Sequence, residues 1–474
     1  MSRPEIRVRM YSHLLGDCFL LTIGNPRTAR AKRAHILIDC GILQQVPREA
    51  AIMKAVAADI ARTVEGRLDL VVVTHEHHDH ICGFRHGRKA LVDEMIIDRL
   101  WLAWTEKRGD PQADLLRDKI VKAKDTVYHL AEAAAVAGVN VTANIEHFNG
   151  PMSPHTGELE IREIIPSLIA RATKTGKVEY LEPGQLRKTP GPVGANTFVL
   201  GPSRLAMRLI KSRPTEGPNK ETYLAGNFEL SLDDRYASAQ SLEDALDPSG
   251  PTPFSPMYEI SPSEVTKDSQ NALQWLWKSY LCDDQLWRNI DTAWLGAAGP
   301  LALKLDHDTN NTSLVLAFEV EPGGDVLLFA GDAQVGNWLS WHDQTYPSTI
   351  PGAPNITATD LLNRTALYKV GHHASHNATL DKLGLSLMIH PGLVAMIPVV
   401  EAEARRKKNG KAVHRGWDMP YSELLTNLLT RTKGRVLRGD ATPGKNAIGD
   451  MVCSDANFLG RVRTTDLYIE YLLP

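Results

Sequence analysis

The chain has 474 residues, 43% hydrophobic and 23% charged, so it can bury a large core in two units or one enlarged domain. Its net charge of −3 excludes a global electrostatic field that would attract nucleic acid or anionic membrane. Five cysteines, an odd number at no metal-like spacing, argue against a disulfide framework. No secretory leader follows Met1, and no apolar run reaches about 18 residues, so we expect a soluble, cytoplasmic protein without a membrane span.

The N-terminal region predicts a mixed sheet covered by helices. Residues 5–23 are typical of a two-strand hairpin, and residues 35–38 of a third strand that ends at Asp39. Residues 49–65 carry apolar side chains at helical spacing, and residues 68–73 form an apolar run typical of a buried strand. This order of strands and helices favours an α/β arrangement.

Histidines and an aspartate cluster directly after the strand at 68–73. In extended backbone alternate residues point the same way, so His75 and His77 should share one side, while Asp79 and His80 face a second position. Imidazole nitrogens and carboxylate oxygens suit zinc, manganese or iron. A solvated polar loop would explain one histidine but explains such a cluster poorly. The segment therefore predicts one half of a metal site.

Two other residues of this segment are expected to play no part in that site. His78 lies between predicted ligands and should point to the opposite side, where a structural or surface role is the better interpretation. Glu76 has the same parity and is expected to be solvated.

The region after the motif is less regular. Helical spacing dominates from residue 95 to about 137, and Trp101 and Trp104 within it are expected to be core residues. Short strands are then predicted at three places: 140–145, 159–165 and 197–200.

Residues 201–300 differ in character because prolines punctuate them and a Trp-rich helix candidate closes them. We interpret this region as an insertion that could cover an active-site mouth. A plain packing helix with core tryptophans is an equally good interpretation.

The second half repeats the plan of a strand that ends in metal-type ligands. A strand pair at 313–320 and 325–329 ends near Asp332, and a strand at 366–370 is followed by His372 and His373. Further elements are predicted beyond these residues: a strand at 393–400, a helix at 421–431 and an extended piece at 465–472.

These motifs resemble the metallo-β-lactamase superfamily. The hallmark His-x-His-x-Asp-His pattern stands at residues 75–80. The run 369–375 is similar in particular to the branch that contains the soluble domain of competence-type DNA-uptake channels. The likeness extends to four further sequence marks: Gly16-Asp17-Cys18, Ile38-Asp39-Cys40-Gly41, Gly331-Asp332 and His372-His373.

The resemblance implies an α/β fold, a four-layer αβ/βα sandwich with a dinuclear metal site along one edge. On this basis we expect residues 1–200 to form the first αβ half and residues 201–300 a largely helical insertion. Residues 301–474 would form the second βα half together with a C-terminal extension.

The resemblance also implies a ligand set for two divalent ions, Zn²⁺ or Mn²⁺. A further first-site imidazole could come from His147 or His155, and strand-end placement favours His147, although related proteins can lack this ligand. The family pattern assigns the other roles as follows: His75 and His77 bind the first metal, Asp79 and His80 the second, Asp332 bridges them, and His372 completes the second site.

Such a site generates a nucleophile. Two cations bridged by a carboxylate lower the pKa of a shared water towards neutrality, and the resulting hydroxide attacks the substrate. The family pattern makes Asp79 both a metal ligand and a catalytic residue. It leaves His373 either as a general acid or as a residue that hydrogen-bonds to the ligands. Asp39 is predicted to accept an N–H from a ligating imidazole. Ser375 is expected to contact the site rather than merely to cap the next helix.

The substrate class rests on the likeness of the run 372–375 to the competence-type branch and on one basic run. The basic run, which could receive a phosphodiester backbone or form a solvated loop, comprises Arg405, Arg406, Lys407 and Lys408. We therefore predict a metal-dependent hydrolase of a phosphodiester, in nucleic acid or a nucleotide. A lactonase, thioesterase or β-lactam-type amide hydrolase is the alternative, because the same nucleophile attacks carbonyl carbon and phosphorus. A non-catalytic metal protein would need a coordinatively closed site.

Overall fold

The computed structural model divides the chain into two compact units. Unit 1 comprises Met1–Asp118, Asn149–Asn227 and Asp306–Pro474, and unit 2 comprises Lys119–Phe148 and Phe228–Leu305. None of the described helices is long and apolar enough to cross a membrane. The structure describes these residues: 4–12, 14–25, 27–43, 46, 48–136, 163–211, 214–215, 221–223, 265–266, 272–282, 305, 307–405 and 417–474.

Unit 1 contains two mixed β-sheets. The first, sheet 1, has eight strands in the order β18-β19-β1-β2-β3-β5-β7-β8. Its antiparallel part runs from β18 to β3 and its parallel part from β3 to β8. Its strands are β1 (Ile6–Tyr11), β2 (Cys18–Ile23), β3 (Ala34–Cys40), β5 (Leu70–Val72), β7 (Arg99–Ala103), β8 (Lys177–Leu181), β18 (Val462–Thr464) and β19 (Tyr468–Leu472).

Sheet 2 has seven strands in the order β17-β16-β15-β12-β11-β10-β9. The strands β12, β15, β16 and β17 are parallel, and β9 to β12 are antiparallel. Its strands are β9 (Leu186–Lys188), β10 (Asn196–Gly201), β11 (Val315–Glu319), β12 (Val326–Phe329), β15 (Thr365–Lys369), β16 (Val394–Ile397) and β17 (Val436–Arg438). Two short pairs are separate: β4 (Arg67–Leu68) with β6 (Ile96–Ile97), and β13 (Thr345–Tyr346) with β14 (Ile356–Thr357).

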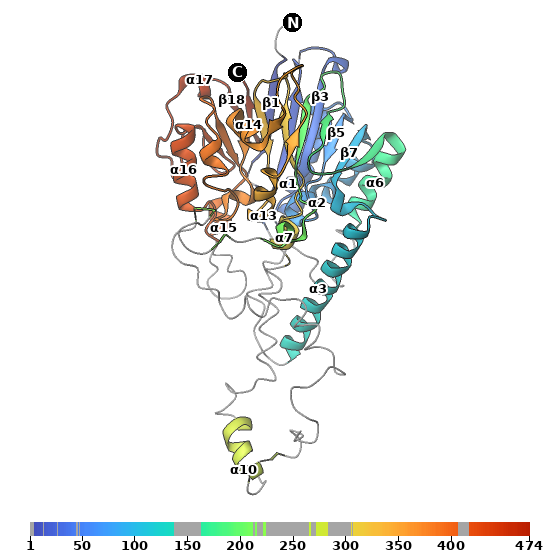
Figure 1. Ribbon diagram of the computed structural model, residues 1–474, viewed down its shortest axis with the longest axis vertical. Helices are drawn as coiled ribbons and strands as arrows, with labels where there is room; N and C mark the ends of the chain where they lie inside the picture. Colours follow the sequence, from blue (N-terminus) through green and yellow to red (C-terminus); the bar gives the residue numbers. More distant parts are fainter. Residues whose placement is uncertain are drawn as a thin grey trace. The chain divides into compact units, whose positions relative to one another are not determined.

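Three hydrophobic clusters show how the layers of unit 1 pack. One cluster joins apolar residues of both sheets, with the Phe19 and Phe329 rings edge to face, 5.7 Å apart. A second lies between sheet 1 and helices α1, α2 and α6, and a third between sheet 2 and α13, α14 and α16. Figure 1 shows α6 beside sheet 1 and α16 beside sheet 2. The described helices are α1 (Glu49–Thr63), α2 (His78–His86), α3 (Pro111–Val136), α6 (Ile164–Thr175), α7 (Ala206–Leu209), α10 (Ala272–Leu276), α13 (Val335–Trp341), α14 (Ala358–Asn363), α15 (Glu401–Ala404), α16 (Ser422–Thr432) and α17 (Ala456–Leu459).

The predicted mixed α/β architecture is therefore confirmed, with helices on the outer faces of two sheets. The predicted hairpin, the strand ending at Asp39 and the helix at 49–65 correspond to β1–β2, β3 and α1. The strands predicted near 313–329 and 366–370 correspond to β11, β12 and β15.

Two predictions from periodicity are wrong. Helical spacing was expected over residues 95–137, but β6 and β7 occupy its start and α3 begins only at Pro111. The apolar residues of β7 are almost all buried, so they need not alternate, and such a run mimics helical spacing. Residues 164–165, at the end of a predicted strand, begin α6 instead.

The C-terminal residues complete both sheets. The strand β17 extends the parallel edge of sheet 2, and β19 pairs with β1 in antiparallel register, with Arg9 opposite Glu470. These C-terminal strands therefore belong to the two sheets of unit 1. The strands predicted at 140–145 and most of the predicted insertion lie outside the described residues.

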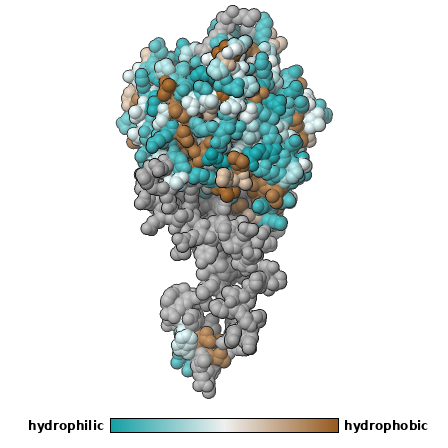
Figure 2. Space-filling view, in the orientation of Figure 1, coloured by the Kyte–Doolittle hydropathy of each residue, from teal (hydrophilic) through white to brown (hydrophobic). Residues whose placement is uncertain are grey.

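The described tryptophans include both buried and exposed side chains. Trp101 and Trp104 are buried, as expected, although Trp101 lies on β7 rather than on a helix. In unit 2, Trp275 on α10 is 61% exposed, so it is not a core residue within the described part. The face of unit 1 shown in Figure 2 is mostly hydrophilic. The exposed hydrophobic side chains of unit 1 include Leu205, Met207 and Ile210 around α7.

A buried ion-pair network joins strands β1 and β19 of sheet 1 to helix α1. Arg9 on β1 contacts Asp59 of α1 at 2.6 Å and Glu470 of β19 at 2.8 Å, and its guanidinium stacks on the Tyr468 ring. Removing one partner of a buried pair leaves the other charge unpaired in a low-dielectric interior.

We expect Arg9→Met to lower the free energy of unfolding by about 3–5 kcal/mol. The control variant Arg67→Met, whose exposed side chain pairs with Asp98 outside this network, should lower it by at most about 1 kcal/mol. Urea unfolding followed by tryptophan fluorescence measures both. Equal decreases in the free energy of unfolding would show that burial of the Arg9 charge does not stabilise this network.

Candidate metal centre

The predicted ligands meet because strands of both sheets end at the same place. The motif at 75–80 follows β5, Asp39 lies near the end of β3, Asp332 follows β12, and His372 and His373 follow β15. Parallel strands present their carboxyl ends at one edge of a sheet, and sites form in the crevice there. The side chains of this edge are nearly all buried.

The first two histidines point at one place. His75 Nε2 and His77 Nδ1 are 2.9 Å apart. Thr74 Oγ1 donates its hydrogen to Asp39, so it must accept from His75 Nδ1, 3.0 Å away. This fixes the tautomer of His75 and leaves the lone pair of Nε2 facing His77. Burial lowers the pKa of His75 well below its usual value, so the ring is a neutral ligand.

His80 has the same arrangement. Its Nδ1 donates to Asp39 Oδ2 at 2.8 Å, and Asp39 also accepts the backbone N–H of Thr74 at 2.8 Å. The second ring nitrogen, Nε2, lies 3.2 Å from Asp332 Oδ2. A lone pair that faces a carboxylate is repelled unless a cation or a proton lies between them. Burial alone would lower the pKa of His80, but the surrounding carboxylates, Asp332 foremost, raise it well above its usual value.

His373 is a third imidazole with one nitrogen bound to an acceptor and the other facing the centre. Its Nδ1 donates to the carbonyl oxygen of Pro398 at 2.7 Å, so the lone pair of Nε2 faces Asp79 Oδ2 at 3.0 Å. Burial opposes protonation here as well, yet the contact with Asp79 raises the pKa of His373. Each of these imidazoles is thus oriented by an acceptor on one nitrogen while the other faces the centre, the arrangement that metal-binding histidines require.

His372 lies differently from its neighbour. Its Nδ1 contacts Ser375 Oγ at 2.8 Å, and its backbone N–H donates to Asp332 Oδ1 at 3.0 Å. The resemblance implied His372 as a ligand and left His373 as a general acid or a hydrogen-bonding neighbour. In the structure the His373 ring has a nitrogen that groups with Asp79 and Asp332, while His372 as a ligand stays a prediction. Burial lowers the pKa of His372 to about 4, so this ring is neutral near pH 7.

The loop that carries both histidines has a strained backbone. Residues 372, 373 and 374 all have left-handed φ angles of 43°, 51° and 62°. Such angles cost non-glycine residues roughly 1–2 kcal/mol each. The contacts of the loop with Asp332 and Pro398 hold it in this conformation. Strain of this kind is characteristic of functional sites.

Negative charge is in excess at this centre. Four buried carboxylates lie around it, and Lys369 is the buried lysine that pairs with them in the described part of the chain. The Lys369 ammonium contacts Asp17, the carbonyl oxygen of Gly331 at 2.8 Å and Asp332 at 3.5 Å. Unpaired buried charge costs several kcal/mol per ion, so protonated imidazoles or metal cations are needed to compensate it. The four carboxylates are Asp17, Asp39, Asp79 and Asp332.

The donor atoms fit divalent metal ions. Asp79 Oδ1 and His80 Nε2 are buried and have no hydrogen-bond partner among the described residues. Ligand atoms close enough to share an ion occur in three groups here. These groups are His75, His80 and Asp332; Asp17, Asp39 and His80; and Asp79, Asp332 and His373.

Several predicted residues remain untested. His147 and His155 lie outside the described residues, as do Arg406, Lys407 and Lys408. Arg405 is described, and its guanidinium pairs with Glu401 at 3.1 Å and with Asp418 at 2.6 Å. Ser375 contacts His372 rather than the three oriented imidazoles.

Sequence reasoning missed two polar anchors of the site. Lys369 ends the apolar strand β15, and a charge at the end of a buried strand was the signal for it. Ser313 accepts the backbone N–H of Asp332 at 3.0 Å and lies 3.3 Å from His75 Nδ1. No pattern in the chain distinguishes this serine from a surface one.

Comparison with known proteins supports the resemblance over part of the chain. Residues 28–156 match the metallo-beta-lactamase superfamily, a span that includes the motif at 75–80 but ends before Asp332. No curated protein matches the chain. No finding supports the competence-type branch in particular.

Asp39 is expected to control metal affinity although it is not placed as a ligand. Asp39→Asn replaces one acceptor oxygen with an amide, so His80 loses its fixed orientation, and metal affinity should fall about 10–100-fold. Competition with a chromogenic chelator measures this affinity. The control is Asp69→Asn, a buried carboxylate that accepts the His35 N–H at 2.8 Å beside the start of β5. A similar fall in both variants would assign the effect to general destabilisation.

Proposed function

We propose that this chain is a metal-dependent hydrolase. The observation that carries the proposal is the set of three imidazoles, His75, His80 and His373, each fixed by an acceptor on one nitrogen. The other nitrogen faces a buried carboxylate in His80 and His373 and faces His77 in His75. A closed structural centre would use all its positions for protein ligands. Here ligand atoms of several overlapping groups surround the position of Asp332, which suits two ions more than one.

The residues that would hold the metals follow from this geometry. His75 Nε2 and His77 Nδ1 converge on one position, and Asp79 with His373 Nε2 on another. Asp332 lies between the two groups through its contact with His80. Divalent ions bound there would supply Lewis-acid chemistry, acidifying water and polarising the bond that is cleaved.

The protein's own residues prepare this chemistry. Burial keeps His75 neutral, and His80 together with Lys369 keeps the pKa of Asp332 well below its usual range despite burial. Asp332 is therefore an ionised ligand near pH 7. The Lys369 ammonium, paired with Asp17 and Asp332, holds these carboxylates in place and balances part of their charge. Its pairing makes it a positioning residue rather than a proton donor.

For the substrate we propose a phosphodiester, in nucleic acid or a nucleotide. The support is the basic run at 405–408 and the likeness of the His372-His373-Ala374-Ser375 run to the competence-type branch. A carbonyl substrate, such as a lactone, thioester or β-lactam amide, is the alternative, because fold does not fix function. A substrate panel separates them.

Loss of a central ligand should abolish turnover without unfolding the chain. His77→Ala and Asp332→Asn are each expected to lower kcat/KM at least about 100-fold, because both remove an interaction with the reacting centre. The assay panel contains bis-p-nitrophenyl phosphate, single-stranded DNA, RNA, cyclic nucleotides, lactones and a chromogenic β-lactam.

Circular dichroism checks the fold of each variant, and His342→Ala, at a partly buried histidine outside the centre, is the matched control. Retained activity in Asp332→Asn against a substrate that the wild type cleaves would contradict the proposed centre.

A polyanionic substrate should sense the basic run. Neutralising Arg405, Arg406, Lys407 and Lys408 is expected to weaken DNA binding and to flatten its dependence on salt, because fewer counterions are released. Fluorescence anisotropy at several salt concentrations measures the slope.

The control removes an equal number of charges elsewhere, through Lys54, Arg62, Arg88 and Lys89. An unchanged slope in the first variant would favour a small substrate without a nucleic-acid backbone.

A further inference from the structure

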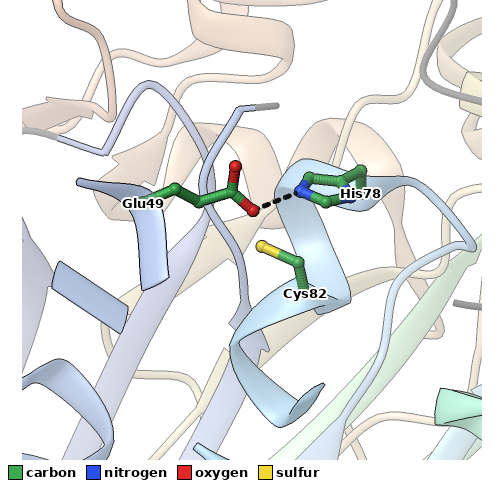
Figure 3. A group of neighbouring side chains, drawn as sticks. All are labelled: Glu49, His78 and Cys82. Atoms are coloured by element: carbon green, nitrogen blue, oxygen red, sulfur yellow. Dashed lines mark hydrogen bonds and ion pairs between the residues drawn. The ribbon is translucent and has the colours of Figure 1, made fainter. Parts of the chain in front are cut away.

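A second cluster of metal-type side chains lies between α1 and α2, separate from the centre described above. Glu49 is the first residue of α1, and His78 and Cys82 are one turn apart on α2. Residues four apart on a helix lie on the same face, and His86 continues that face by one more turn. Figure 3 shows the carboxylate, the imidazole and the thiol directed towards one another.

The distances within this cluster are short. Glu49 Oε1 lies 2.8 Å from His78 Nε2 and 2.9 Å from His86 Nε2. The ligand atoms of Glu49, His78 and Cys82 all lie within 4.8 Å of one another. The thiol is buried in contact with the Ile42 backbone, accepting its N–H at 3.3 Å.

We propose that Glu49, His78 and Cys82 bind a divalent transition-metal ion, with His86 as a fourth ligand. Thiolate sulfur, imidazole nitrogen and carboxylate oxygen together are the donor set of four-coordinate zinc. The set also balances charge, since one carboxylate and one thiolate neutralise a divalent ion while both histidines stay neutral. A neutral cluster is the arrangement that a mostly buried position tolerates best.

Binding requires the loss of one proton. The Cys82 S–H bond breaks, the sulfur–metal bond forms, and the proton leaves to solvent. The Ile42 N–H already points at the sulfur and can continue to donate to the thiolate. The His78 ring stays neutral when its remaining proton is carried by Nδ1 while Nε2, which faces Glu49 Oε1, holds the ion.

An ion here would join α1 to the first turn of α2. That turn also carries Asp79 and His80 of the first centre. The second ion would therefore fix the start of the helix that positions these two ligands. The competing interpretation is a hydrogen-bonded network in which Glu49 alone ties the two histidines of α2 to α1.

Cobalt substitution distinguishes the two interpretations, because a thiolate bound to Co²⁺ gives a near-ultraviolet charge-transfer band and imidazoles and carboxylates do not. The ligands assigned to the first centre include no cysteine, so the band reports on the second site. We expect the band in the metal-depleted full chain reconstituted with Co²⁺, its loss in Cys82→Ser, and its retention in Cys453→Ser, a buried cysteine in another core cluster. Zinc content should fall by one ion per chain in Cys82→Ser only.

Two further measurements keep the test decisive. Asp332→Asn should keep the band, which separates this site from the proposed hydrolytic centre. Glu49→Gln keeps the thiol and should weaken cobalt binding at least tenfold in a titration followed by this band. No band in the wild-type chain at saturating Co²⁺, or a band that persists in Cys82→Ser, would overturn the proposal even if another variant failed to fold.

Discussion

Four buried carboxylates at the edge where the two sheets end are the constraint on which the rest of the site depends. Asp17, Asp39, Asp79 and Asp332 are each almost fully buried, and the fold gives them Lys369 and the hydrogens of nearby imidazoles. A hydrophobic core between the sheets can position such groups but cannot stabilise their charge. The cost is offset only if positive charge shares the space, so the residues that would destabilise the chain by themselves form clusters that could hold metal ions.

The orientation of the imidazoles depends on residues that are not ligands. Asp39 holds His80 and Thr74 together, and Thr74 in turn holds His75. These contacts link the ends of β3 and β5, so the register of two neighbouring parallel strands sets the direction of two rings. On sheet 2, the carbonyl of Pro398, beyond the end of β16, does the same for His373. Strand pairing thus fixes tautomers, and tautomers decide which nitrogen is available as a ligand.

The sequence predicted the polar residues that follow strands, but it did not predict every strand. A ligand cluster after an apolar run, as at 75–80, predicted both an element and a site, because polar residues there contradict the core that precedes them. The prediction for β7 was wrong because a strand that is buried on both faces shows no alternation of apolar and polar residues. Which of His372 and His373 directs a ring nitrogen at Asp79 was not predictable from spacing, because it depends on three consecutive left-handed residues. Asp39 was predictable from strand-end placement, whereas Ser313 was not.

Helix α2 connects the two candidate sites through its sequence. Its N-terminal residue His78 faces Glu49, while the next two residues, Asp79 and His80, face the carboxylates and His373. Because successive residues on a helix point about 100° apart, adjacent side chains can serve two separate clusters. His78 points away from the first centre, as the alternation of side chains predicted, and it therefore points towards other residues. A residue directed away from one set of ligands is directed towards another surface, and here that surface carries a carboxylate, a thiol and a second imidazole.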